Sequence, residues 1–444
     1  LVYTLEKPVP YFLTMLTYVS FLPVNGKFLS EVGSKFGTDN KTILYNGAYV
    51  MKTFEPQTSR ELVKNEAYWD KGNVFINKLS YKYNKEAGTL APEMFLRGEI
   101  TYASIPTATM DSWMKEATKK TQVRPASTSF YTYFYAFNFD PKFAKEYEPE
   151  NWKVAVNNTN FRKSIFHALD RKAAMLTAEP ISPERRLSNT ITPKNFVSFK
   201  GTDYTKTADL AAFATTDSFD KAKAAQAKAD AMKELQGKAT FPVKMMMPFN
   251  TGASDWTSRV QVIEQQLEGL LGKDYIDVIP VGFPPTNFLA ATRRAGNFAF
   301  IEANWGPDYA DPETYTDPFV PGGTYNKPEL ATGYAEANGK TKYENMVAAA
   351  KAEVKDMAKR YELFAKAEAF LIKEAMVIPY GIGGGGFIAS KLDPFTAPYA
   401  PFGVSGLKFK YQVINEKPMT TDEYNTGFAK WEKDRADALK QAGQ

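Results

Sequence analysis

Several short segments of the chain alternate hydrophobic and polar residues, a pattern that predicts half-buried β-strands. The segment 43–55 has an Asn-Gly turn followed by the alternating run AYVMKTF, and 60–65 is its expected partner strand. The segment 74–83 alternates Val, Ile, Leu and Tyr with polar residues. The stretch 127–139 (STSFYTYFYAFNF) is the most aromatic part of the chain. Because aromatic and β-branched residues favour strands, it predicts a strand that is buried on both faces or lines a cleft.

Other segments repeat apolar residues every three or four positions and therefore predict amphipathic helices. The predicted helices are 90–98 ended by Gly98, 161–176 capped by Asn160, 219–235 capped by Ser218, 256–271 ended by Gly272, one or two helices in 344–377, and a charged helix in 418–444. Further strands are predicted at 243–250, 275–281, 298–304 and 376–380, the last ending at Pro379. Strands and helices alternate through 219–380, which predicts βα units and an α/β fold class.

Composition narrows the chemistry that this chain performs. Its 444 residues suggest two or three domains, and they include 32 Phe, 25 Tyr and 6 Trp but no Cys and one His. The absence of Cys excludes thiol catalysis, disulfides and Cys-ligated zinc. The single His167, inside a predicted helix, is interpreted as structural, which leaves little room for His-based triads or multi-His metal sites. We therefore expect no catalytic residue, no metal and no cofactor.

Charge and hydropathy exclude two classes of partner. The net charge is +5, and Lys and Arg are interleaved with acidic residues rather than gathered in a block. This distribution is typical of a solvated surface, so we expect no nucleic-acid partner. No apolar run approaches the ~20 residues of a membrane-spanning helix.

One turn-rich segment, 305–319 (WGPDYADPETYTDPF), gathers four carboxylates. Their spacing differs from that of an EF-hand, and three prolines stiffen the loop, so a metal site is disfavoured. Trp305 and Tyr309 flank Asp308, and a carboxylate between aromatic side chains suits capture of a cationic group. A capped turn after a strand explains the same residues equally well.

A series of motifs then follows a known order along almost the whole chain. The motifs are Lys7–Phe12 with Pro23-Val24-Asn25, Asn46–Tyr49, Lys64-Asn65 with Tyr68–Asp70, Arg97–Ile100, Phe161–Ile165 with Ala168–Arg171, Trp305–Tyr309, and Tyr361, Ala367-Glu368 and Ile378–Tyr380. Together they resemble the oligopeptide-binding family of bacterial ABC-importer extracellular solute-binding proteins (family 5 type), and the Gram-positive members in particular.

The resemblance implies an α/β, two-lobed periplasmic-binding-protein-like fold (type II, peptide-binding class). On that basis 1–145 is part of lobe I, 146–390 is lobe II, and 391–444 returns to lobe I and ends in the C-terminal helix. Family members carry further residues ahead of the first motif, so lobe I is expected to be incomplete here.

The resemblance also implies a function. The protein is expected to capture oligopeptides between the lobes and to deliver them to an ABC transporter permease. It is expected to be a monomer when complete and a lipoprotein on the extracellular face of the cell membrane, or periplasmic in a Gram-negative cell. Its lipid anchor would lie on the missing N-terminal part.

The same resemblance assigns a set of peptide-binding residues. Asp308 is expected to hold the peptide α-ammonium group, with Trp305, Gly306 and Tyr309 as neighbouring contacts. The other expected cleft residues are Asn138, Phe139, Asn250 and Arg293. One departure stands at Glu302, where some relatives place an arginine that meets the carboxylate of a short peptide. This exchange favours longer peptides.

Three alternatives remain open at this point. A binding protein of this class can take a dipeptide, a nickel chelate or a sugar instead of an oligopeptide. Asp308 and Glu302 can form the carboxylate pair of a hydrolase, since they flank a strand-to-turn junction. A structural or adhesive surface protein would bind no small ligand.

Overall fold

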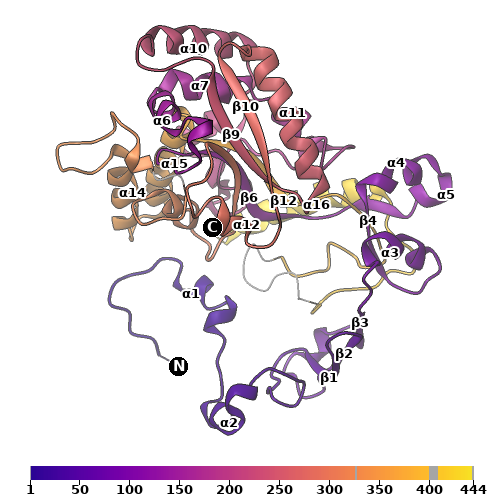
Figure 1. Ribbon diagram of the computed structural model, residues 1–444. Helices are drawn as coiled ribbons and strands as arrows, with labels where there is room; N and C mark the ends of the chain where they lie inside the picture. The colour runs from indigo at the N-terminus through magenta and orange to yellow at the C-terminus, as the bar shows by residue number, and fades with distance from the viewer. Residues whose placement is uncertain (1, 326–327, 400–408, 443–444) are drawn as a thin grey trace. The chain divides into compact units, whose positions relative to one another are not determined.

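The computed structural model describes residues 2–325, 328–399 and 409–442. Its contacts divide the chain into two compact units (Figure 1). Unit 1 comprises Leu1–Tyr11, Thr128–Gly384 and Ala438–Gln444, and unit 2 comprises Phe12–Ser127 and Gly385–Asp437. The expected lobe boundaries at 145/146 and 390/391 stay predictions, and the contacts place the change of unit earlier on both occasions.

Two sheets form the centre of unit 1. In the first, β6 (Thr128–Phe137) lies between β11 (Phe300–Trp305) and β12 (Val377–Gly384), and both pairings are antiparallel. In the second, β9 (Val243–Asn250) and β10 (Ile276–Phe283) are parallel and are joined by α11 (Ser254–Leu271). This β9–α11–β10 unit confirms the βα pattern expected from the sequence.

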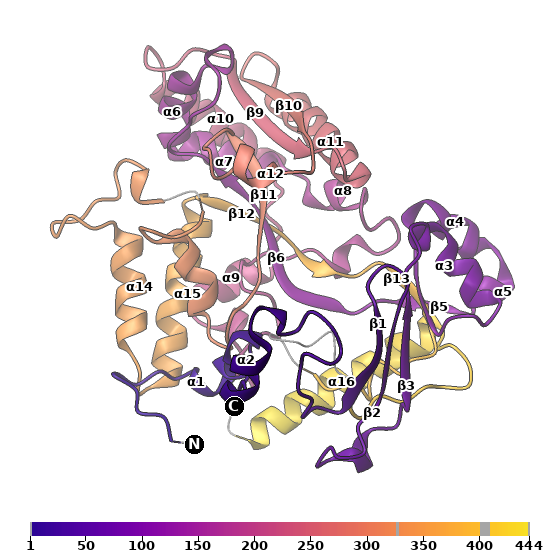
Figure 2. The ribbon, with the colours of Figure 1, turned by 60° about the horizontal axis from the view of Figure 1, so that its bottom comes forward.

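Helices cover these sheets, with α10 and α7 packed together and α14 beside α15 (Figures 1 and 2). The helices of unit 1 besides α11 are α6 (Pro149–Asn157), α7 (Thr159–Ala168), α8 (Arg171–Met175), α9 (Leu210–Ala214), α10 (Lys221–Glu234), α12 (Phe288–Ala291), α13 (Glu313–Thr316), α14 (Lys342–Ala352) and α15 (Met357–Lys373). A short hairpin, β7 (Ser198–Phe199) and β8 (Thr202–Asp203), completes the regular elements of this unit.

The core of unit 1 is built on the aromatic strand β6. Its second half is buried on both faces, as the run of aromatic residues predicted, whereas its first residues are not. Tyr135 stacks on Phe300 with ring centroids 5.1 Å apart, and Phe137 lies 5.0 Å from the same ring. Trp152 packs against Phe137 from α6. These contacts bury large apolar area, the main favourable term in folding, and hold β6 and β11 in register.

Unit 2 contains two small antiparallel sheets. One is β1 (Tyr49–Glu55), β2 (Ser59–Lys64) and β3 (Lys78–Lys82), and the other places β13 (Phe387–Ser390) between β4 (Tyr102–Ile105) and β5 (Val123–Pro125). Its helices are α1 (Phe12–Met15), α2 (Gly26–Val32), α3 (Ala87–Leu96), α4 (Thr107–Lys115), α5 (Ala117–Lys120) and most of α16 (Thr421–Gln441). Its own apolar cluster includes Phe95, Trp113, Val123 and Phe387.

The helix expected over 161–176 is two helices. α7 ends at Ala168, and Asp170 begins α8 by accepting a hydrogen bond from the Ala173 N–H at 3.0 Å. Asn158, rather than Asn160, caps α7 by accepting from the Phe161 N–H at 2.8 Å. An Asp inside a helical pattern competes for backbone N–H groups and starts a new helix, which apolar spacing alone does not reveal.

Two further boundaries differ from expectation. Asp220, not Ser218, caps α10 by accepting from the backbone N–H groups of Ala222 and Lys223. The strand expected to end at Pro379 continues to Gly384, because the pairing with β6 shifts between Pro379 and Gly381. A proline is tolerated in a strand at such an irregularity, where its missing N–H breaks no ladder bond.

Candidate functional site

The loop that follows β11 presents Asp308 at the surface of unit 1. Asp308 is exposed, and within the described part of the chain its carboxylate has neither an ion-pair partner nor a hydrogen-bond donor. The surrounding protein still removes some water from this carboxylate, and this desolvation raises its pKa above the usual value for aspartate. An uncompensated carboxylate in such a place is a ready acceptor for a cationic group.

Thr314 of α13 holds this loop at two points. Its backbone oxygen accepts a hydrogen bond from Trp305 Nε1 at 2.7 Å, and its hydroxyl oxygen accepts from the Asp308 N–H at 3.1 Å. The two predicted residues are therefore fixed by the same turn of helix. Because a ligand then finds the carboxylate already positioned, less entropy is lost on binding.

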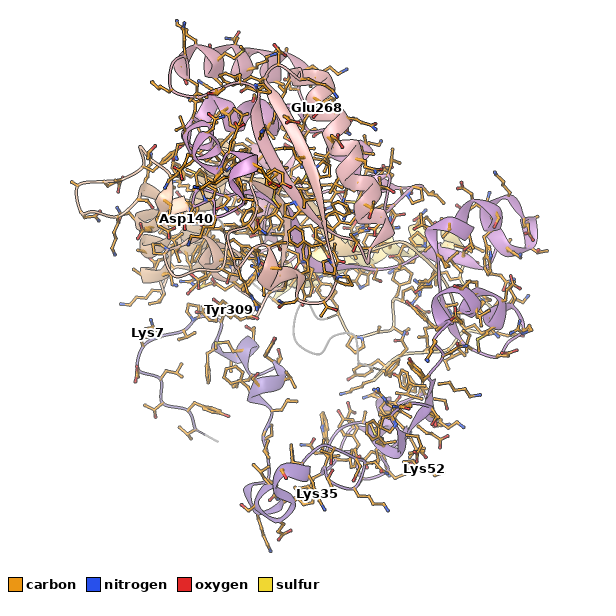
Figure 3. All side chains as sticks on the ribbon, in the orientation of Figure 1. Lys7, Lys35, Lys52, Asp140, Glu268 and Tyr309 are labelled. Atoms are coloured by element: carbon orange, nitrogen blue, oxygen red, sulfur yellow. The ribbon has the colours of Figure 1, made fainter. Side chains whose placement is uncertain are left out.

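Tyr309 closes the other side of the loop. Its ring stacks on Tyr11, with centroids 4.0 Å apart and planes 9° from parallel. Figure 3 labels Tyr309 among the side chains. Burial is the main cause that raises the pKa of both phenols, that of Tyr11 to about 12. Both side chains therefore stay neutral at physiological pH, and the stack forms an aromatic wall beside Asp308.

Gly306, directly after β11, lies under the ring of Tyr131. A Cβ atom at this position would lie 2.7–3.0 Å from ring atoms of Tyr131 on β6. Atoms of this kind do not approach so closely, so a side chain here displaces the Tyr131 ring. Gly306 thus lets an exposed tyrosine lie over the backbone next to Asp308.

A buried ion cluster anchors the rest of the segment. Arg360 of α15 donates two hydrogen bonds to Asp311, at 2.9 and 2.8 Å, and one to Glu313 at 2.6 Å. The side chains of Arg360 and Asp311 are each 1% exposed. Lys351 pairs with Glu313 and with Asp317. Three of the four carboxylates in this segment therefore form ion pairs with Arg360 or Lys351, and Asp308 is the one that does not.

A cavity of about 450 Å³ brings two other predicted residues together. Asn250, at the end of β9, and Arg293, after α12, both line it, with Glu302 and Asn304 of β11 and Tyr325. Tyr325 links this cavity to the loop, because its ring also lies edge-on to Trp305, 5.7 Å between centroids. Six of the eight sequence-predicted residues thus form two neighbouring groups on unit 1.

Glu302 is neutralised inside the fold. Arg259 of α11 donates from Nε to one carboxylate oxygen at 2.7 Å and from Nη2 to the other at 3.1 Å, and the Tyr135 hydroxyl donates at 3.1 Å. Burial disfavours the charged guanidinium, but the attraction of Glu302 raises the pKa of Arg259 overall. With both oxygens occupied, Glu302 is not available as the second carboxylate of a hydrolase.

Asn138 and Phe139, in contrast, are inside unit 1. Asn138 is 5% exposed and donates to the backbone oxygens of Gly296 and Phe298. Phe139 is 1% exposed and lies under the guanidinium of Arg162. These two side chains support the fold below the cavity, and their burial leaves no surface for a direct ligand contact.

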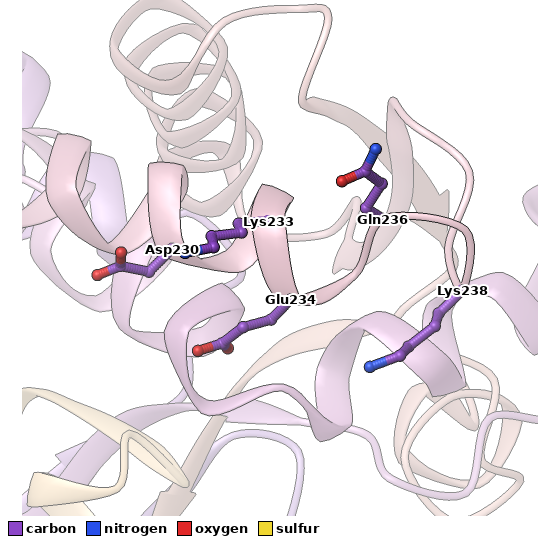
Figure 4. Close-up of a pocket in the computed structure, with 5 residues that line it drawn as sticks. All are labelled: Asp230, Lys233, Glu234, Gln236 and Lys238. Atoms are coloured by element: carbon purple, nitrogen blue, oxygen red, sulfur yellow. The ribbon is translucent and has the colours of Figure 1, made fainter.

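A second cavity, of about 500 Å³, lies at the end of α10 (Figure 4). Its lining residues are Asp230, Lys233, Glu234, Gln236 and Lys238. Glu234 is already bonded to Asn158 and Asn160, and the cavity holds none of the predicted site residues. We assign it no function.

Two kinds of feature are missing from the described residues. No three His, Cys, Asp or Glu side chains in 2–325, 328–399 and 409–442 gather in a metal-binding arrangement. Within the same ranges, no helix has the length and apolar character needed to cross a bilayer. His167 is half-buried, and its Nδ1 lies 2.8 Å from the backbone oxygen of Ser218.

Comparison with known families assigns the chain to one of them. Residues 1–327 match the family described as bacterial extracellular solute-binding proteins, family 5 Middle. The chain belongs to this family. It is a family of binding proteins rather than of enzymes, and its members work outside the cytoplasm, in the periplasm or at the cell surface. The relationship expected from the ordered motifs is confirmed.

Relatives and solved structures agree with the assignment to family 5. The oligopeptide-binding protein AliA of Streptococcus pneumoniae is 32% identical over 99% of this chain and 73% of its own length. The oligopeptide-binding protein SarA of Streptococcus gordonii is 31% identical over 99% and 72%. The Listeria monocytogenes OppA structure with bound peptide matches with a TM-score of 0.62 at 20% identity, covering 93% of this chain and 73% of that one. The expected fold class is thereby confirmed.

Several residues that hold this candidate site escaped the sequence analysis. Arg259, Arg360 and Tyr325 lie far along the chain from the residues they hold. The Asp255–Arg259 pair, four residues apart on α11, was a visible signal of a charged helix face. Nothing local indicated that Glu302 completes that pair.

Proposed function

We propose that this protein binds oligopeptides outside the cytoplasm and delivers them to the permease of an ABC transporter. The observation that carries the proposal is the Asp308 carboxylate, exposed, free of cations in the described chain and fixed through Thr314. Membership of family 5 and the oligopeptide-binding names of the relatives support the same ligand class.

The chemistry of recognition follows from this carboxylate. A peptide α-ammonium donates charge-assisted hydrogen bonds to Asp308, which are stronger than neutral ones. Trp305, Gly306 and the Tyr309 ring provide the surrounding wall, and Asn250 and Arg293 offer polar contacts in the adjoining cavity. Backbone groups of an extended peptide add affinity without selecting a sequence.

The remaining organisation is part of the same proposal. The segments 1–145 and 391–444 belong to one lobe and 146–390 to the other. The protein is a monomer held at the outer membrane face by a lipid anchor, and it performs no chemistry on its ligand. Family membership supports the extracellular placement on which these statements rest.

The test compares free-amine and N-acetylated peptides of the same sequence by isothermal titration calorimetry. The unmodified protein should bind the free-amine peptide at least tenfold more tightly, since a charge-assisted hydrogen bond is worth roughly 1.5–3 kcal/mol. Asp308→Asn should abolish this difference while keeping the residual affinity for the acetylated peptide.

Asp209→Asn is the matched control, because Asp209 is also an exposed aspartate of unit 1 and loses the same charge. It should retain the preference for the free amine. Full affinity of Asp308→Asn for free-amine peptides would remove Asp308 from the site. The absence of any peptide binding by the unmodified protein would refute the function itself.

A further inference from the structure

The cavity beside the Asp308 loop has a composition that amine capture does not explain. It lies wholly within unit 1, among the end of β9, the start of α11, α12 and β11, and has a volume of about 450 Å³. This volume exceeds what a single peptide backbone unit needs.

Charge is the first clue. The single carboxylate on the wall, Glu302, is already neutralised by two hydrogen bonds from Arg259. Arg293 and Arg294 also line the cavity, and in the described chain neither forms an ion pair. The cavity therefore presents uncompensated positive charge, and an anion gains most from entering it.

The Arg293 guanidinium is held in place rather than free to swing. It lies 4.5 Å from the centroid of the Tyr325 ring. The Tyr325 hydroxyl in turn donates to the backbone oxygen of Asn304, at the end of β11. A stacked guanidinium keeps its fork of donors in one plane, which suits bidentate recognition of a carboxylate.

Unpaired hydrogen-bond donors point to the same ligand. Nε and Nη1 of Arg293 are buried without an acceptor in the described chain, and Nε1 of Trp256, on another wall, is buried and unpaired in the same way. All three atoms are donors. Buried polar groups are normally paired, so these three donors are complementary to a group that accepts hydrogen bonds, as an ionised carboxylate does.

The remaining walls are apolar. Trp256 packs against Phe288 with ring centroids 5.1 Å apart, and Ile301 of β11 faces the same space. Such walls suit the methylene groups of a side chain that ends in a charge. We propose that the cavity is a specificity pocket for an acidic side chain of the bound peptide, with Arg293 as its carboxylate partner. This inference rests on the proposed peptide-binding function.

The test begins with the unmodified protein and a set of free-amine peptides of equal length. Each peptide carries one Glu at a different position in an otherwise neutral sequence, and a Gln partner is made for every Glu. At one position, the Glu peptide should bind at least tenfold more tightly than the Gln peptide. The reason is that hydrogen bonds between charged groups are about twice as strong as neutral ones. The remaining positions should show no comparable preference.

Variants then assign the preference to its residue. Arg293→Gln should reduce the Glu-to-Gln affinity ratio to about one, whatever its effect on the affinity for the Gln peptide. Arg294→Gln removes an equal charge from the other arginine that lines the cavity. It should keep most of the ratio, because Arg294 is the exposed one of the two. Circular dichroism melting confirms that both variants fold. Loss of the ratio in Arg294→Gln alone would overturn the role of Arg293.

Other outcomes separate this inference from the function beneath it. Peptide binding with no Glu preference at any position overturns the pocket inference and leaves the proposed function standing. If amidation of the peptide C-terminus lowers the affinity and replacement of Glu by Gln does not, the inference is also overturned, because the cavity then receives the terminal carboxylate. If no free-amine peptide binds, both proposals fail. The comparison of Glu with Gln peptides on the unmodified protein decides the matter even if Arg293→Gln does not fold.

Discussion

At the scale of single residues, the fate of each carboxylate in 305–319 depends on whether a cation of the fold reaches it. Asp311 and Glu313 meet Arg360, and Asp317 meets Lys351, whereas Asp308 meets none in the described chain. The residue type is the same at three of these positions. Tertiary neighbours therefore separate one candidate binding residue from three that hold the loop.

Because the Asp308 carboxylate has no cationic partner in the described chain, peptide affinity should depend on pH. Desolvation raises the pKa of its carboxyl group, so protonation begins at a higher pH than for an ordinary aspartate. Affinity should be constant above that raised pKa and fall as the pH drops through it, because only the carboxylate attracts an ammonium group. It should also fall above about pH 8, where the peptide α-amino group loses its proton.

Calorimetric titrations from pH 3 to 9 measure the fall in affinity at low pH (the acidic limb) and the fall above about pH 8 (the basic limb). Asp308→Asn should lose the acidic limb, and an N-acetylated peptide should lose both. An acidic limb that is unchanged in Asp308→Asn would assign it to a different group.

At the scale of elements, α15 helps to position the loop that carries Asp308, although this helix contributes no predicted ligand contact. Arg360 on this helix binds Asp311 and Glu313, and Thr314 next to them holds Trp305 and Asp308. The order of connection runs from a buried arginine, through a short helix, to the exposed carboxylate. A rigid support of this kind keeps a binding group positioned before the ligand arrives.

We predict that Arg360→Gln lowers the free energy of unfolding by about 3–5 kcal/mol, because it leaves the buried carboxylate of Asp311 without its partner. Chemical denaturation followed by circular dichroism measures this change. Lys359→Gln, at the exposed neighbour that pairs with Glu362, should cost at most about 1 kcal/mol. Equal losses in the two variants would show that the buried cluster does not anchor the loop.

At the scale of the whole molecule, the chain builds two cores from interrupted segments. It changes unit after Tyr11, after Ser127, after Gly384 and after Asp437. The first core centres on Trp152 and the rings of β6, and the second on Trp113 and Phe387. The proposed binding residues all belong to unit 1.

Separate cores predict that unfolding is not a single two-state transition. Differential scanning calorimetry should resolve two transitions. Trp152→Ala should lower the one that belongs to unit 1, and Trp113→Ala the other, each by about 3–5 kcal/mol of stability. One transition that both substitutions shift equally would show that the units unfold together.

The sequence alone determined much of the local structure and the family. Alternation and helical spacing located β9, β11 and α11, since these patterns reflect which face of one element is buried. Ordered motifs indicated family 5, and the aromatic neighbours of Asp308 indicated a site for a cation. The sequence misplaced the caps of α7 and α10, because several Asn, Asp and Ser residues compete for the same N–H groups.

Only the tertiary structure decided which of the expected site residues are available. It buried Asn138 and Phe139, paired Glu302 with Arg259, and brought Arg293 and Asn250 to one cavity. These outcomes depend on distant partners, such as Phe298 for Asn138, 160 residues away, and Arg259 for Glu302, 43 residues away. A residue's own type determines its charge and hydrogen-bonding capacity. Whether a distant group satisfies that capacity, or leaves it for a ligand, is determined by the fold.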